Sequence, residues 1–311
     1  MATYTGALPW AHGAKLDELS TKEEMIEKSG LNWTVRAEPL KASLFNGTQV
    51  WVPDTQVVIR EDNNTGLSVV GPVWTAIQNE ETVTIADAFT SEAEDTKFMR
   101  AGPSYGGVNT FIVLKVPGEL RVRNTVVDEY FLLTNSFDGS AALTLSFTAI
   151  ARDTSAIISI PLNKLPNKHK IRHSRNAPDR IKEARRILGF SETYFNGLDL
   201  ALNNLCAINI TDSKVNEVLD AVMPFKATGE SARILNIREQ VTTIFNYEKQ
   251  QTGFSTGWEL YRAFTTYADH FKTFRGEKGN PDAIFEKRFH SVTDGPSSNL
   301  KEKVFSAIQE L

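Results

Sequence analysis

The chain lacks the features that would place it in a membrane or outside the cell. It has one cysteine among 311 residues, Cys206, which excludes an internal disulfide and a cysteine-based metal site. No apolar run reaches the ~18 residues that a transmembrane helix needs. The N-terminus has no basic region followed by an apolar one, as a secretory signal would have. These absences favour a protein of the reducing cytoplasm that has no membrane partner.

Motifs for catalysis and for metal binding are also scarce. No phosphate-binding P-loop occurs. The acidic residues show no arrangement typical of a metal-dependent nuclease. His169 and His173 are four positions apart, but basic residues lie between them, and cations oppose a divalent metal ion. We therefore expect no catalytic residue, no metal and no cofactor.

The charge of the chain is low overall but unevenly distributed. The net charge is −4, which argues against a protein that coats nucleic acid without specificity. Residues 164–186, here called the basic segment, carry nine basic and two acidic side chains, a net charge of +7, so the rest of the chain carries −11. The nine cationic residues are Lys164, Lys168, Lys170, Arg172, Arg175, Arg180, Lys182, Arg185 and Arg186.

The basic segment has more than one interpretation. A surface that holds a polyanion needs several cations side by side, because each neutralised phosphate releases counterions. On a helix, Lys182 would share one face with Arg185 and Arg186, which follow it by three and four positions. A solvated charged linker is the plainer interpretation, and an acidic protein is a third kind of partner. The charge asymmetry favours contact with nucleic acid.

The first half of the chain predicts a β-rich α+β fold. Alternating apolar residues predict strands, and short polar or glycine-rich stretches predict the turns between them. The spacing is typical of an antiparallel meander that has helices packed against it. Strands are expected at 49–60, 67–70, 98–101, 110–116, 120–123, 127–134 and 141–150, and helices between a Ser20 or Thr21 cap and Gly30 and at 79–89.

The second half of the chain predicts mainly helices. Helical patterns occur at 178–188, 191–205, 212–223, 231–250, 258–271 and 300–311. Aromatic residues recur every three or four positions along 258–271, and we interpret them as core. The change of character predicts a β-rich α+β domain at 1–160, followed at 161–311 by the basic connection and a helical domain.

Three residues outside the basic segment are secondary candidates for nucleic-acid contact. Tyr105 lies at the tip of a glycine-rich turn, residues 102–107, where its ring would stack on a base. Arg100 and Arg152 lie near the ends of predicted strands and would line the sheet. A hairpin that needs glycine dihedrals is the plainer interpretation of the turn.

Several stretches, in their order along the chain, resemble the phage/plasmid-like protein family, a domain of unknown function found in phages, plasmids and bacteria. They are Pro9-Trp10-Ala11-His12-Gly13 and residues 30–35, 78–81, 101–107, 130–140, 171–174 and 257–263. The resemblance implies a phage or mobile-element setting, with the host cytoplasm as location, and it implies no reaction. Residues 151–156 depart from the family, which usually has an Arg-Val-Val-Cys-x-Asn-Thr stretch there.

The expected architecture is also loosely similar to that of phage single-strand annealing proteins, which combine a sheet-and-helix core with a basic groove and form rings or filaments. The similarity implies a non-catalytic homo-oligomer that binds and anneals single-stranded DNA. The expected phosphate contacts are Lys168, Lys170, Arg172, His173, Arg175, Lys182, Arg185 and Arg186. Two alternatives stay open: a protein-interaction module, such as an anti-defence factor that binds an acidic host protein, and a metal-dependent nuclease.

Overall fold

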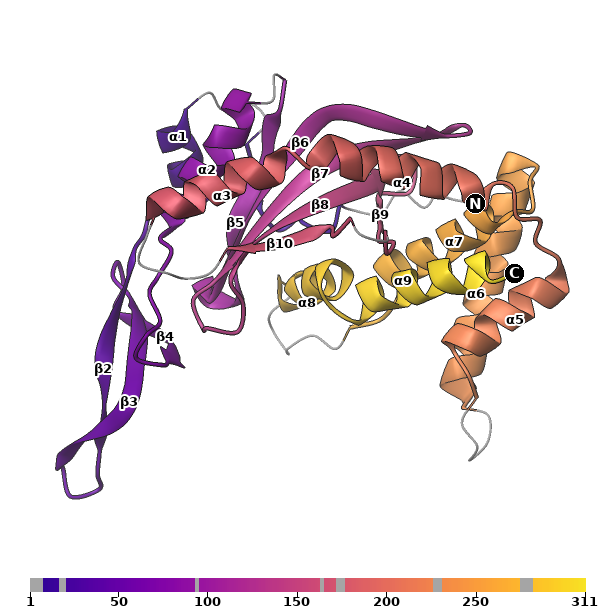
Figure 1. Ribbon diagram of the computed structural model, residues 1–311. Helices are drawn as coiled ribbons and strands as arrows, with labels where there is room; N and C mark the ends of the chain where they lie inside the picture. Colours follow the sequence, from indigo (N-terminus) through magenta and orange to yellow (C-terminus); the bar gives the residue numbers. More distant parts are fainter. Residues whose placement is uncertain are drawn as a thin grey trace.

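The centre of the computed structural model is an antiparallel sheet with helices on both faces and a separate three-stranded arm that projects from one end (Figure 1). The structure describes residues 8–16, 21–92, 95–162, 165–171, 177–225, 231–274 and 282–311. Strands dominate the first half and helices the second, so the α+β prediction is confirmed. Within the described ranges, no helix has the length and apolarity to cross a bilayer.

The central sheet has the strand order β1-β5-β6-β7-β8-β10, with β9 also paired to β8. Its long strands β7 and β8 are buried over most of their length, because both faces are covered by helices. The strands are β1 (Ala14–Lys15), β5 (Lys97–Ser104), β6 (Asn109–Val122), β7 (Thr125–Ser136), β8 (Leu143–Ala151), β9 (Ala156–Ile158) and β10 (Lys168–Ile171).

Two predicted breaks in the sheet differ from the structure. The strands expected at 110–116 and 120–123 are one strand, β6, because pairing with β7 is only interrupted between Lys115 and Glu119 and then resumes. The turn expected at 102–107 begins later, because Gly102 and Pro103 still pair with β6. The chain turns only at Tyr105, where a short 3-10 turn (Tyr105–Gly107) begins.

One face of the sheet is covered by helices from both halves of the chain. Helix α2 (Asn79–Glu92) lies there with α1 (Lys22–Lys28), whose predicted Thr21 cap is confirmed by a capping box with Glu24. Helices α3 (Ala177–Leu188) and α4 (Ser191–Leu205) run nearly end to end along the same face (Figure 1). The largest hydrophobic cluster therefore joins sheet residues such as Phe131 to Leu198 of α4 and Tyr261. The division into two domains near residue 160 stays a prediction.

The C-terminal helices form the remaining layer. They are α5 (Asp212–Val222), α6 (Ala232–Thr252), α7 (Gly257–Thr266), α8 (Asp282–Thr293) and α9 (Pro296–Gln309), with a π-helical turn (Tyr267–Phe271) after α7. Every residue of α7 is buried, so the aromatic residues of this stretch that we interpreted as core are core, apart from the half-buried Phe271. Helix α8 and the short strands β9 and β10 were not predicted, because their patterns are short or polar.

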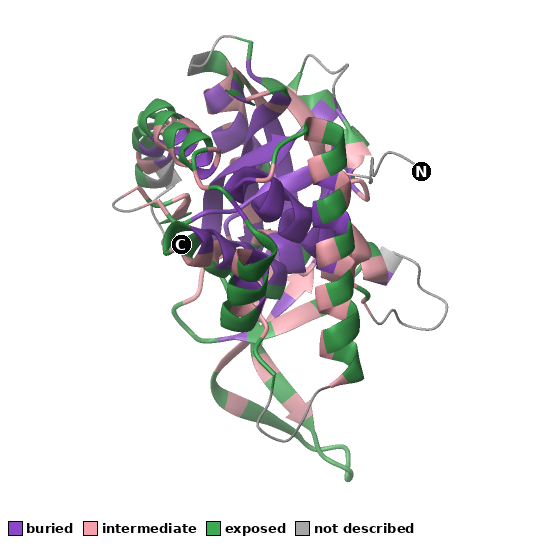
Figure 2. Cartoon of the chain, turned by 90° about the vertical axis from the view of Figure 1, so that its right-hand side faces the viewer, coloured by how far each residue is buried: buried purple, intermediate pink, exposed green. Residues whose placement is uncertain are grey.

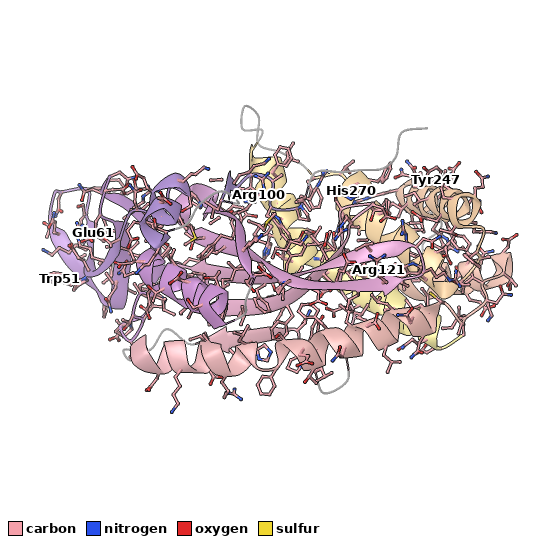
Figure 3. All side chains as sticks on the ribbon, turned by 90° about the horizontal axis from the view of Figure 1, so that it is seen from above. Trp51, Glu61, Arg100, Arg121, Tyr247 and His270 are labelled. Atoms are coloured by element: carbon pink, nitrogen blue, oxygen red, sulfur yellow. The ribbon has the colours of Figure 1, made fainter. Side chains whose placement is uncertain are left out.

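The arm consists of β2 (Val35–Ser43), β3 (Gln49–Arg60) and β4 (Thr65–Val70), of which β2 was not predicted. Its base packs through Trp33, Val58 and Phe137. Beyond the base the arm is two-stranded and exposed (Figure 2), and Trp51 lies near its far end, 62% exposed (Figure 3). A two-stranded ribbon with no core of its own is marginally stable in water.

A buried ion pair ties the last helices to the sheet. The ammonium group of Lys301 on α9 lies 2.6 Å from one carboxylate oxygen of Asp269 and donates to the carbonyl of Ile157 at 2.9 Å. Asp269 in turn accepts a hydrogen bond from the Ile157 N–H at 2.7 Å. Burial lowers the pKa of the Lys301 ammonium group, and the carboxylate of Asp269 opposes that effect. This ion pair and its hydrogen bonds therefore join strand β9, the π-helical turn and α9.

We predict that Lys301→Met destabilises the protein by about 3–5 kcal/mol, because it leaves the carboxylate of Asp269 buried without its cation. The double variant Lys301→Met/Asp269→Asn keeps an acceptor for the Ile157 N–H and removes the charge. It should be more stable than the single variant. Urea denaturation measures both, and a single variant as stable as the wild type would contradict the prediction.

Candidate functional site

The basic segment lies along the edge of the central sheet. Strand β10 is the last strand in the sheet and pairs only with β8, and α3 follows on the face that α2 covers. Successive residues of β10 point to opposite faces. His169 and Ile171 face α3 and α4, whereas Lys168 and Lys170 face the side of α8. The edge strand therefore divides its charges between two surfaces.

Lys168 is engaged in the fold. Its ammonium group lies 2.7 Å from Asp294 and donates to the carbonyl of Thr293 at 2.8 Å, at the C-terminal end of α8. A cation near the C-terminus of a helix is favourable, because the last carbonyls are its natural partners. Lys170, two residues further along β10, is exposed. Of these two predicted contacts, Lys170 is therefore the one that presents its charge to solvent.

The exposed face of α3 brings together two predicted contacts and an aromatic ring. Lys182 and Arg186 are exposed and lie one helical turn apart. The guanidinium of Arg186 pairs with Glu183 at 2.6 Å and lies 5.4 Å from the ring centre of Phe190. Phe190 is 42% exposed, and its ring also stacks with the imidazole of His169, with ring centres 6.2 Å apart and 9° between the planes. We call Lys182, Arg186, Phe190 and His169 the aromatic-basic surface.

His169 contributes a ring to this surface rather than a charge. Burial lowers the pKa of its imidazole, and the neighbouring guanidinium of Arg186 adds to that effect. The ring also contacts Phe147 of β8, which fixes its orientation. Neither His169 nor Phe190 was predicted as a contact. In the sequence, Phe190 could have been recognised as an aromatic residue that follows a cluster of cations by three or four positions.

Several predicted contacts lie outside the described part of the chain. They are Arg172, His173 and Arg175, together with the side chain of Arg185, whose backbone belongs to α3. Their role stays a prediction.

The secondary candidates are separated by the length of the sheet. Arg100 donates to the backbone carbonyls of Ala11 and Gly13, at 3.0 and 2.6 Å, and so holds the N-terminal segment against β5 (Figure 3). Tyr105 lies at the end of the sheet where β6 begins, half-buried. Arg152 lies after the end of β8, at the opposite end of β6 and β7. The fold does not bring these three residues together.

Arg152 belongs to an ion-pair network. It contacts Asp128 at 2.5 Å and Glu119 at 3.0 Å, and Lys115 contacts Asp128 at 3.1 Å. Burial would raise the pKa of the Asp128 carboxyl group, but hydrogen bonds from Arg152 and Lys115 hold it below its usual value. These carboxylates balance the guanidinium of Arg152, which makes it a weaker phosphate ligand than an exposed cation.

In the described ranges, no three His, Cys, Asp or Glu side chains lie where they could hold one metal ion.

Among the described carboxyl groups, Glu129 on β7 has the pKa that is shifted furthest. Burial raises this pKa to about 7, and the charge of Asp199 on α4 adds to the effect. Gly118 lies directly against this carboxyl group, where a larger residue would collide with it.

We predict that Glu129→Gln stabilises the protein at pH 8 but not at pH 4.5. The pKa of Glu129 is higher in the fold than in the unfolded chain, so the wild type loses stability as pH rises from about 4.5 through about 7. Glutamine does not titrate, and its advantage should grow over that range and then level off. Urea denaturation at several pH values measures this, and an advantage that is independent of pH would refute it.

Comparison with known proteins shows a family without a known activity. Searches of curated proteins and of solved structures found no match. The family model described as a domain of unknown function (DUF932) matches residues 66–288, which run from β4 to α8 and include the basic segment. Because this match spans well over half of the 311 residues, the chain belongs to the DUF932 family.

Proposed function

We propose that this protein binds single-stranded DNA, without catalysing any reaction of the strand, through the aromatic-basic surface and the adjoining edge strand β10. The observation that carries the proposal is the exposed ring of Phe190, which is 42% exposed and contacts both the imidazole of His169 and the guanidinium of Arg186. Single-strand binders combine cations that follow the backbone with aromatic rings on which bases stack.

The chemistry of the surface suits a strand with accessible bases. A duplex hides the faces of its bases, so an exposed aromatic ring adds nothing to duplex binding unless the duplex is opened. Lys182 and Arg186, which precede the ring along α3, would hold phosphates beside it, and the backbone of β10 brings Lys170 to the same edge of the sheet. The acidic remainder of the chain would confine the strand to this region by repulsion.

Annealing and assembly extend this proposal. The ordered stretches that resemble the phage/plasmid-like family suggest a phage or mobile element as the setting, and the similarity to annealing proteins suggests a ring or filament of this chain. An assembly would align several aromatic-basic surfaces along one strand. Such multivalent contact strengthens binding without any new contact within a single subunit.

A protein-interaction module is the second candidate function, and the arm is the observation that favours it. Leu44, Phe45 and Trp51 near its far end are exposed, at 47%, 115% and 62%. Exposed apolar groups gathered at the end of a projection are typical of protein contacts. Co-purification of a stoichiometric host protein, without nucleic acid, would favour this function over DNA binding.

We predict that Lys182→Gln/Arg186→Gln weakens binding to a labelled oligothymidylate and flattens its salt dependence. Each phosphate contact to a single strand contributes about 0.7 to the slope of log K against log salt, so the loss of two should reduce the slope by about 1.4. Fluorescence anisotropy over a salt series measures the slope. The exposed Lys303 of α9 offers a control, because Lys303→Gln removes a charge elsewhere and should leave the slope unchanged.

Two results would count against the proposal in different ways. If the wild type does not bind the oligonucleotide at low salt, single-strand binding is wrong. If it binds and the double variant binds with the same slope, DNA is held elsewhere on the protein.

We further predict that Phe190→Leu weakens binding by about 1–3 kcal/mol, the contribution of one base stacked on an aromatic ring. Leucine keeps apolar contact at the junction of α3 and α4 but has no ring face. Because no charge changes, the salt slope should stay that of the wild type. Equal affinity of the variant and the wild type would show that Phe190 does not stack on a base.

A further inference from the structure

A cavity of about 350 Å³ lies on the other face of the sheet, between the turn after β5, the adjoining ends of β6 and β7, and helix α8. Phe111 and Phe289 supply apolar wall. Hydroxyl and amide side chains dominate its polar lining, among them Ser104, Asn109, Thr134, Ser136 and Ser140. No lysine or arginine is among the described residues that line it, whereas Asp294 and His290 are. The cavity therefore suits a small neutral molecule.

Ser104, which lines this cavity, contacts a histidine that is not itself among the lining residues. The Oγ of Ser104 lies 3.0 Å from the Nε2 of His12, a contact between residues 92 positions apart in the chain. Ser104 lines the cavity and is otherwise buried, at 2% exposure. A hydrogen bond of this length between a hydroxyl and an imidazole is the geometry in which a base activates a nucleophile.

The imidazole of His12 is held in place by aromatic rings. Its centre lies 4.8 Å from that of Phe111 and 5.3 Å from that of Phe289. Gly13, the next residue, has no room for a side chain, because a Cβ there would come within 2.6 Å of the Phe111 ring. The sheet and α8 thus hold the segment that carries His12 close against β5, with the ring pre-oriented toward Ser104.

The backbone changes direction immediately after Ser104. Tyr105, Gly106 and Gly107 have φ values of 52°, 68° and 97°, three consecutive residues in the left-handed region. The N–H of Tyr105 donates to Glu286 of α8 at 2.7 Å, which fixes the turn. Gly102-Pro103-Ser104-Tyr105-Gly106 has the G-x-S-x-G spacing of the nucleophile turn in serine hydrolases, but here Ser104 itself is extended and strand β6 follows in place of a helix. Successive N–H groups in such turns also bind anions.

We propose that Ser104 and His12 form a nucleophile–base pair that hydrolyses a small, neutral carboxylic ester held in this cavity. Ser104 is the catalytic nucleophile and His12 the base that accepts its proton. The side-chain amide of Asn109, which is opposite Ser104 in the β5–β6 pair and also lines the cavity, is the candidate donor to the negative oxygen that forms during acyl transfer.

The chemical steps need no reactant besides the ester and water. The Oγ of Ser104 bonds to the carbonyl carbon while its proton passes to Nε2 of His12. The bond from that carbon to the alcohol oxygen then breaks, and the alcohol leaves with the proton from His12. Water attacks the acyl-serine, its proton passes to His12, and the carboxylic acid leaves as that proton returns to the oxygen of Ser104.

The charge of the lining separates this site from the proposed DNA surface. Lys168 already pairs with the carboxylate of Asp294 at 2.7 Å, and no lysine or arginine is among the described residues that line the cavity, so a phosphate would find neither to pair with there. The aromatic-basic surface lies across the sheet, on the face that α3 and α4 cover. Failure of either proposal leaves the other intact.

The test is labelling of the purified full chain with a fluorophosphonate probe, followed by peptide mapping, together with hydrolysis of p-nitrophenyl acetate. The wild type should be labelled at Ser104, and heat-denatured protein should not be labelled. Ser104→Ala should lose labelling and hydrolysis. The glutamine of His12→Gln can form hydrogen bonds, but it cannot accept the proton of Ser104 and return it. The rate of labelling and the rate of ester hydrolysis should therefore both fall by about 10²–10⁴-fold. The wild-type rate should rise with pH as the imidazole loses its proton, and this rise should disappear in His12→Gln.

Two further variants separate chemistry from folding. Ser159→Ala removes another buried, hydrogen-bonded serine hydroxyl that is not part of the cavity lining, and should keep full labelling. Ser104→Cys preserves size and a nucleophile, and acyl transfer to its thiol should be detected by mass spectrometry. The proposal is wrong if folded wild type is not labelled, if the label lies on another residue, or if His12→Gln reacts at the wild-type rate. In those cases the Ser104–His12 contact only anchors the N-terminal segment.

Discussion

The buried ion pair between Lys301 and Asp269 ties the last helices to strand β9 of the sheet. Both side chains are almost fully excluded from water, at 0% and 1% exposure, and their remaining polar partners belong to the backbone of Ile157. Two charges in such a place are stable only while each has the other and the adjoining hydrogen bonds are formed. The positions of β9, the π-helical turn and α9 are therefore linked, and α8, which precedes α9, is placed with them.

The position of α8 matters for both proposed sites. Its C-terminal end accepts Lys168, the first residue of the edge strand β10, and its glutamate Glu286 holds the turn that follows Ser104. Phe289 of the same helix packs on the ring of His12. A helix that the sequence patterns did not reveal thus organises the cavity and fixes one end of the strand that carries the basic segment.

The sheet separates the two proposed activities by charge. On the face covered by α3 and α4, an exposed aromatic ring lies among cations, which suits a polyanion with accessible bases. On the other face, a cavity lined by hydroxyls, amides and a carboxylate suits a neutral molecule. Strand β10 contacts both sides, because Lys168 pairs with Asp294 of the cavity wall and His169, which points to the opposite face, contacts Phe190.

The sequence by itself determined the α+β class, the long strands, most helices and the buried stripe of α7. In these elements the buried positions are regularly spaced, so the apolar residues recur with a regular period. The sequence also revealed the +7 basic segment, since charge is visible in composition. Only the tertiary structure decided that Lys168 pairs with Asp294, that Arg152 is held by carboxylates, and that Phe190 and His169 join Arg186. The same holds for the pairing of His12 with Ser104 across 92 positions. Such contacts depend on strand order and on which face of the sheet a helix covers, and neither is recorded in local spacing.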